Sequence, residues 1–276
     1  MPLNRPCGCG APVFECELWG PIVARLRAAY PELGTGALAQ VERKELAGGL
    51  GGFAAIAREA RRGPSGGTPL RRYAALHVDL GREAARATGA GVVIDSSKAA
   101  ALAYLVASLT SADLYVVHLV RDPRAAGFAW RKVMRRPKGY EDVPVFMAPQ
   151  TVSRSARQWL RRNAVIEGLL RRRLPRDRYL RVRYEDFVER PRETVETICA
   201  FVGERQARPP LVDERVVRLR PNHTVGGNPA RFSVGEVELR LDREWEERMD
   251  PWERRLATLL AAPLIVRYRY PLRVGH

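Results

Sequence analysis

The chain has 276 residues, of which 46% are hydrophobic, enough for a sizeable core in one or two domains. No apolar run reaches the roughly 18 residues of a membrane helix, and the start, Met1–Arg5, lacks the apolar stretch of a secretory signal. We therefore expect a soluble, cytoplasmic protein without a membrane span. The formal net charge of +16 favours anionic ligands such as nucleotides, sulfated molecules, nucleic acid or acidic membrane surfaces. Arginines on solvated helix faces are the alternative explanation.

The first 90 residues are expected to be mostly helical. Leucine and alanine recur at helical spacing over 18–31, 37–61 and 70–89. A loop rich in glycine and proline, 62–69, separates the second and third of these segments.

From residue 91 the pattern changes to strands alternating with helices. Short apolar segments that favour strands occur at 91–94, 115–120 and 179–183. Helical patterns follow them, one ending near 109 and the others over 151–174, 192–203 and 248–262. This alternation indicates βαβ units, hence an open α/β sheet that binds ligands at the carboxyl edge of its strands.

Three of the four cysteines, Cys7, Cys9 and Cys16, fall close together, whereas Cys199 is remote. Such a cluster could hold a metal, but no fourth ligand is nearby in the sequence and the spacing matches no standard zinc knuckle. We expect structural thiols in a glycine-rich turn, with no metal and no disulfide scaffold.

The segment Arg121-Asp122-Pro123-Arg124 directly follows the second predicted strand. Asp122 suits a helix N-cap and Pro123 suits the first helical turn. The Arg121 guanidinium would then lie at the carboxyl edge of the sheet beside a helix N-terminus, where an anion such as a phosphate is favoured. A salt bridge that anchors the helix is the alternative, and spacing alone does not decide between them.

Two further segments offer chemistry more weakly. In Asp95-Ser96-Ser97-Lys98, Lys98 could stabilise charge on a transferring group and Asp95 could accept a proton. Helix capping by Ser96 or Ser97 is the commoner use of such residues, and it is favoured when the segment is taken alone. In 223–232, glycines would let backbone amides approach a phosphate that Arg231 could pair with, although a surface turn would look similar.

These segments occur in one order, joined by Tyr184-Glu185-Asp186-Phe187 and Gly227-Asn228-Pro229-Ala230-Arg231-Phe232. In that order they resemble the superfamily of sulfotransferases that use 3′-phosphoadenosine-5′-phosphosulfate, with the match closest to its bacterial branch. The resemblance implies a P-loop-NTPase-like open parallel sheet flanked by helices. It also implies one domain over 1–276, with a helical insertion at 18–90 and a nucleotide-binding core with C-terminal helices at 91–276.

The resemblance implies roles for individual residues. Arg121 matches the arginine that holds the nucleotide 3′-phosphate, and Tyr184 matches a residue near the adenine. The late loop that closes over the phosphates is matched by Gly227, Asn228 and Arg231. Lys98 resembles a lysine near the reacting sulfate. Where the animal cytosolic branch has a catalytic histidine this chain has serine, at Ser97, so Asp95 is our candidate for the general base.

The sequence departs from the family pattern at two places. A serine that normally follows the 3′-phosphate arginine is Ala129 here, which removes one hydroxyl donor. The strand and Pro-Arg-Ser-Gly-Thr-Thr loop that open the family do not precede Cys7, and the lookalike 64–68 has no apolar strand before it, so it is interpreted as a linker. The sheet is thus expected to lack its first strand, which either lies upstream of Met1 or has been lost.

Transfer of a sulfuryl group from the nucleotide donor to a hydroxyl or amine acceptor, without a metal, is the function that the resemblance implies. A degraded, inactive nucleotide-binding relative is the alternative. A basic nucleic-acid-binding protein is disfavoured, because the aromatic residues lie in core patterns and are not interleaved with the basic ones.

Overall fold

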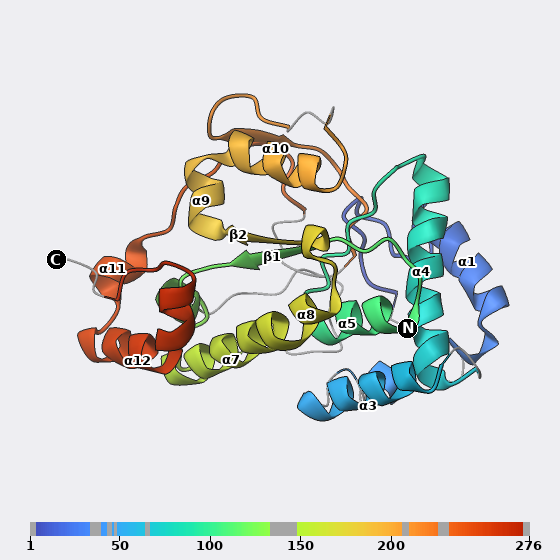
Figure 1. Cartoon of the computed structure of the whole chain (residues 1–276). Helices are drawn as coiled ribbons and strands as arrows, with labels where there is room; N and C mark the ends of the chain where they lie inside the picture. The colour runs from blue at the N-terminus through green and yellow to red at the C-terminus, as the bar shows by residue number, and fades with distance from the viewer. Residues whose placement is uncertain are drawn as a thin grey trace. The chain divides into compact units, whose positions relative to one another are not determined.

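The computed structural model describes residues 4–33, 40–42, 46, 49–63, 67–132, 148–205, 210–225 and 232–272 (Figure 1). The chain divides into two compact units. The first comprises Met1–Val116, Arg172–Pro175 and Arg220–Ser233. The second comprises Val117–Arg171, Arg176–Leu219 and Val234–His276. A single domain over 1–276 stays a prediction.

The first unit is helical, as the leucine and alanine spacing predicted. Its described helices are α1 (Trp19–Ala29), the 3-10 turn η1 (Pro31–Leu33), α3 (Leu50–Arg61), α4 (Pro69–Thr88) and α5 (Ala100–Leu109). Helix α4 begins where the Thr68 hydroxyl accepts a hydrogen bond from the Arg71 amide, and it ends at Gly89 in the left-handed conformation. One buried cluster includes Ile56, Tyr73 and Leu105, and so joins α3, α4 and α5. Of the helix predicted over 37–61, residues 37–39, 43–45 and 47–48 lie outside the described part.

The strand predicted at 91–94 is wrong. The segment has no strand structure, and its three apolar side chains are exposed, Ile94 to 86%. A strand needs a hydrogen-bonded neighbour for its backbone groups, and none of the described segments pairs with this one. A short apolar run therefore does not by itself form a strand, because strand preference depends on the neighbouring strands and on burial.

The second unit contains a small parallel sheet between strand β1 (Val116–Val120) and strand β2 (Tyr179–Arg183) (Figure 1). Both strands were predicted. Strands β3 (Val216–Leu219) and β4 (Gly235–Glu238) pair antiparallel, with Val217 opposite Val237. Within the described part of the chain the parallel sheet has only these two strands, so the wider P-loop-type sheet is not confirmed.

Helices surround this sheet. Helix α6 (Pro123–Ala129) follows β1, and α7 (Val152–Val165) continues through the π-helical turn η3 (Ile166–Leu170) into α8 (Arg171–Arg173), which confirms the helix predicted at 151–174. The remaining elements are the 3-10 turn η4 (Arg176–Arg178), α9 (Tyr184–Glu189), α10 (Pro191–Phe201), α11 (Glu244–Arg248) and α12 (Pro251–Arg267).

Helix α12 runs past the predicted end at 262, through Pro263. Proline lacks an amide hydrogen and usually interrupts a helix. Here Ala261, Leu264 and Ile265 are buried in one cluster with Val120 and Tyr268, and this packing holds the helix together beyond the proline. In the described residues, none of the helices is both long and apolar enough to cross a membrane.

Candidate functional site

The site begins at the turn from β1 into α6. The Asp122 carboxylate accepts a hydrogen bond from the Arg124 amide at 2.8 Å, and Pro123 occupies the first helical turn, so the predicted N-cap is confirmed. The same carboxylate also accepts from Nε and Nη2 of Arg124, at 2.9 and 2.6 Å. Arg124 donates further to the Pro271 carbonyl at 2.9 Å, and its guanidinium lies 4.9 Å from the centre of the Trp245 ring. Because Arg124 is only 1% exposed and its Nε and Nη2 both bind Asp122, we interpret it as a residue that serves the fold.

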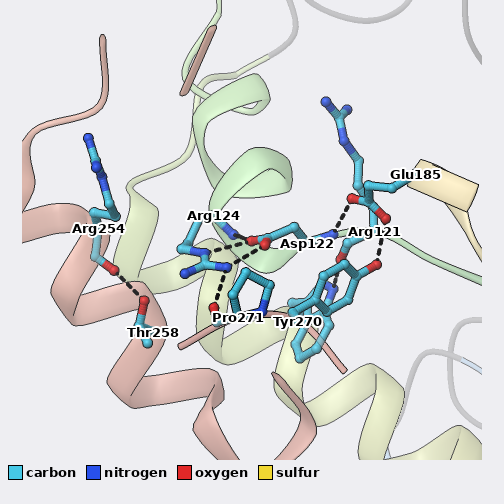
Figure 2. Close-up of polar contacts among 9 residues, drawn as sticks. Arg121, Asp122, Arg124, Glu185, Arg254, Thr258, Tyr270 and Pro271 are labelled. Carbon is cyan, nitrogen blue, oxygen red and sulfur yellow. Dashed lines mark hydrogen bonds and ion pairs between the residues drawn. The ribbon is translucent and has the colours of Figure 1, made fainter. Parts of the chain in front are cut away.

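Arg121, the other arginine of the motif, is differently placed. Figure 2 shows its guanidinium pointing away from the Asp122–Arg124 pair. Its side chain is 27% exposed and lies 4.8 Å from the centre of the Tyr184 ring. Its one recorded carboxylate partner, Asp242, is 3.6 Å from Nη2, and its buried Nε has no hydrogen-bond partner among the described residues. Arg121 therefore retains donor capacity for an anion.

Glu185 fixes the backbone beside Arg121. Its Oε1 accepts a hydrogen bond from the Asp122 amide at 2.9 Å, and its Oε2 accepts from the Tyr270 hydroxyl at 2.7 Å (Figure 2). The carboxylate thus links the turn after β1 to the start of α9, which carries Tyr184. Sequence reasoning did not assign Glu185 a role, although it stands next to Tyr184 in a segment already singled out.

Behind Arg121 a chain of hydrogen bonds runs into the core. Trp159 Nε1 donates to the Arg121 carbonyl at 2.9 Å, and the Trp159 carbonyl accepts from Asn163 Nδ2 at 2.8 Å. The buried ring of His118 lies between Asn163 Oδ1, 2.7 Å from Nε2, and the Tyr179 hydroxyl, 2.6 Å from Nδ1. Burial lowers the pKa of His118, so the ring is neutral and contributes hydrogen bonds without charge.

Arg121 shares its acidic neighbour with a second basic residue. Lys132 Nζ lies 3.8 Å from the Asp242 carboxylate that also faces Arg121. Asp242 and Lys132 were not predicted from the sequence, and no sequence motif marks them.

A shallow cleft of about 440 Å³ lies elsewhere in the second unit. It is lined by residues of β2, α9 and α10 and by four arginines, Arg181, Arg183, Arg190 and Arg269. Arg121 does not line it.

Lys98 and Asp95 belong to the first unit, in the exposed segment before α5. Asp95 Oδ1 accepts a hydrogen bond from the Ser97 amide at 2.7 Å, a local turn that places Lys98 in the left-handed conformation, with φ of +63°. Helix α5 starts after Ala99 without a side-chain cap, so the expected capping by Ser96 or Ser97 is wrong.

The predicted site residues are therefore brought together in part. Arg121 and Tyr184 are in contact in the second unit, whereas Lys98 and Asp95 are described with the first. Gly227, Asn228 and Arg231 lie outside the described residues. The roles of all seven remain predictions.

The cysteine cluster has a fourth member that the sequence did not suggest. Sγ of Cys7 and of Cys16 lie 3.7 and 3.2 Å from Nδ1 of His223, and with Cys9 these side chains form one group of possible metal ligands. The expectation that no metal is bound, which assumed that a fourth ligand was missing, is not confirmed.

Comparison with known proteins gives one family match, which covers the middle of the chain. The model of the sulfotransferase family matches residues 72–207, a span that contains Lys98, Arg121 and Tyr184. No curated protein and no solved structure shows significant similarity to the chain. The sulfotransferase family is thus shown over residues 72–207 of this chain.

Proposed function

We propose that the chain is a sulfotransferase that takes its sulfuryl group from 3′-phosphoadenosine-5′-phosphosulfate and transfers it to a hydroxyl or amine acceptor. The observation that carries this proposal is that the two arginines of Arg121-Asp122-Pro123-Arg124 differ in their hydrogen-bond partners. Arg124 is buried and binds the Asp122 carboxylate through Nε and Nη2, whereas Arg121 keeps a buried Nε without a partner among the described residues. A buried, unpaired donor of this kind suits a phosphate, which accepts charge-assisted hydrogen bonds.

Arg121 and Tyr184 would hold the nucleotide. The guanidinium would bind the 3′-phosphate in place of its distant partner Asp242, and the Tyr184 ring that it faces would contact the adenine. Glu185 acts on this pair as a positioning residue, because it binds the Asp122 amide next to Arg121 and lies next to Tyr184.

When bound, the donor supplies an activated sulfuryl group whose leaving group is the 3′,5′-bisphosphate. In the transfer a bond forms from the acceptor oxygen or nitrogen to sulfur, the bond from sulfur to the phosphate oxygen breaks, and the acceptor proton passes to a base. Lys98 would stabilise negative charge at the departing phosphate, and Asp95 is the proposed base. Positioning and charge stabilisation would supply most of the rate, as in phosphoryl transfer.

Calorimetric titration with 3′-phosphoadenosine 5′-phosphate and with adenosine 5′-monophosphate tests the nucleotide site. The two ligands differ only in the 3′-phosphate. Arg121→Ala is expected to weaken the bisphosphate about 10- to 100-fold, since a hydrogen bond to a charged group contributes roughly 1.5–3 kcal/mol. The monophosphate should bind the variant and the parent chain with similar affinity.

Arg86→Ala is the matched control. Arg86 is an exposed arginine on α4 that pairs with Glu83, so its loss removes one positive charge far from the motif in the sequence. The bisphosphate should bind this variant as it binds the parent. Equal weakening in Arg86→Ala and Arg121→Ala, or equal affinity of the parent for both nucleotides, would remove Arg121 from the site.

Transfer of labelled sulfate from the donor to a panel of hydroxyl and amine acceptors separates this function from the alternative. A sulfotransferase is expected to label at least one acceptor class. Binding of the bisphosphate without any transfer would instead identify an inactive nucleotide-binding relative.

A further inference from the structure

The glycine-rich turn near the start of the chain gathers sulfur atoms at regular distances. Cys16 Sγ lies 3.7 Å from Cys7 Sγ and 3.8 Å from Cys9 Sγ, and all three thiols are free. His223 brings Nδ1 to 3.2 Å from Cys16 Sγ and 3.7 Å from Cys7 Sγ. All four ligand atoms lie within 4.8 Å of one another.

The four contacts Cys7–Cys16, Cys9–Cys16, Cys7–His223 and Cys16–His223 are close to four of the six edges of a tetrahedral zinc site. Zinc bonds of about 2.3 Å to sulfur and 2.0–2.1 Å to nitrogen separate neighbouring sulfur atoms by about 3.8 Å, and sulfur from nitrogen by about 3.5 Å. Three thiolates and one imidazole form a ligand set that zinc prefers, and it leaves no open coordination position.

We propose that Cys7, Cys9, Cys16 and His223 bind one zinc ion in a closed, structural site. All four ligands lie outside residues 72–207, the span that the sulfotransferase family model matches.

The backbone around the cluster is shaped to bring the ligands together. The Gly10 amide donates to the Cys7 carbonyl at 2.9 Å, and Gly10 adopts φ of +94°, so the chain turns sharply between Cys7 and Ala11. The Gly8 amide donates to the Thr224 carbonyl at 3.0 Å, which fastens this turn beside His223. A Cβ added at Gly8 would lie 2.7 Å from the Asn222 carbonyl oxygen, so only glycine allows this approach.

The outer contacts of His223 also suit a metal ligand. Its Nε2 faces the Glu17 carboxylate at 3.7 Å, and its carbonyl accepts a hydrogen bond from Trp19 Nε1. A carboxylate is one of the groups that commonly orient a ligating histidine from its second ring nitrogen. Simple packing of thiols in the core does not account for the cluster, because Cys9 is exposed and the His223 ring is partly exposed.

Zinc content per chain, measured by mass spectrometry on protein without a histidine tag, tests the proposal. The full chain is purified from zinc-supplemented medium with a reductant that contains no thiol. We expect about one zinc ion per chain, with occupancy falling to a small fraction in Cys16→Ser and in His223→Ala. Cys199→Ser is the matched control, since Cys199 belongs to the second unit, and it should keep the zinc content of the parent.

Cobalt titration of the unaltered chain tests metal binding even if the variants do not fold. Tetrahedral cobalt with thiolate ligands absorbs strongly through sulfur-to-metal charge transfer. Cys9→Ser is expected to lower that band by about a third, because one of three thiolates is lost. Zinc-free parent protein together with a titration that gives no charge-transfer band would overturn the proposal, as would equal zinc in Cys16→Ser and Cys199→Ser.

Discussion

The backbone amide of Asp122 donates a hydrogen bond of 2.9 Å to the carboxylate of Glu185, a residue 63 positions later in the chain. The bond ties the segment that carries Arg121 to the segment that carries Tyr184. The second carboxylate oxygen of Glu185 accepts from the Tyr270 hydroxyl, so the end of the chain holds the same group. The relative position of Arg121 and Tyr184 thus depends on the carboxylate of a third residue, Glu185.

Glu185→Ala is expected to weaken binding of 3′-phosphoadenosine 5′-phosphate and to cost about 1–3 kcal/mol of stability, because the Asp122 amide loses its acceptor. Glu185→Gln keeps an oxygen for that amide and should recover most of the affinity. Tyr270→Phe removes one hydrogen bond to Glu185 and leaves the Asp122 contact in place. Calorimetry and urea unfolding of the three variants measure both effects. A purely structural role would leave nucleotide affinity unchanged in the folded fraction of Glu185→Ala.

Replacement of the two arginines of the motif should lower stability by very different amounts. Arg124→Ala leaves the buried Asp122 carboxylate without its bidentate partner, which is expected to cost about 3–5 kcal/mol of unfolding free energy. Arg121→Ala removes a partly exposed side chain with a long ion pair, so the loss should stay within about 1 kcal/mol. Urea unfolding compares the two. Similar destabilisation by both changes would contradict the assignment of Arg124 to the fold and of Arg121 to a ligand.

His118 is expected to make the fold sensitive to mild acid. Burial holds its pKa below the ordinary value of about 6.5, so the unfolded chain binds the proton more readily than the folded chain does. The contribution of neutral His118 to the free energy of unfolding is therefore complete above about pH 6.5. It is lost as pH falls below that value toward the lower pKa of the folded state. His77 is shifted in the same direction, so only a variant isolates His118.

Urea unfolding of the parent chain and of His118→Gln between about pH 5 and 7.5 measures this contribution. Both proteins are expected to lose stability as pH falls, and the parent should lose more. Parallel profiles for the two proteins would show that His118 does not titrate differently in the folded state.

Glu167 should protect the fold in stronger acid. Burial acts to raise the pKa of this carboxyl group, but hydrogen bonds and charge from Arg267, Arg171 and Arg181 together lower it to about 2. A folded pKa below the unfolded value gives stability that is present above about pH 4.5 and lost as pH falls through about 2. A shift of this size corresponds to at most about 3 kcal/mol of stability at neutral pH, and solvent screening of the half-exposed arginines lowers that figure.

Glu167→Gln should be less stable than the parent at pH 7, and the difference should shrink steadily as pH falls toward 2. Chemical unfolding at several acidic pH values follows this difference. Glu193→Gln is the control, because Glu193 forms an exposed pair with Arg190, for which a near-zero effect is expected. A difference between Glu167→Gln and the parent that does not change with pH would rule out the proposed ion-pair contribution.

Much of the local structure followed from the sequence. Helical spacing located the longer described helices but not the short α9 and α11. The order strand, Asp122, Pro123 placed the start of α6, because capping acts between residues only a few positions apart. The family resemblance rested on the same short segments. The segment 91–94 shows the limit of such arguments, since its apolar residues could form a strand only with a neighbour that the segment itself does not supply.

What the tertiary structure alone decided is which side chains are paired. Arg121 and Arg124 flank the same Asp122, and the choice between them depends on Trp245 and Pro271, more than a hundred residues away in the chain. Cys16 meets His223 across 207 positions. No short-range pattern encodes such contacts, because they arise only when distant elements pack and bury their polar groups together.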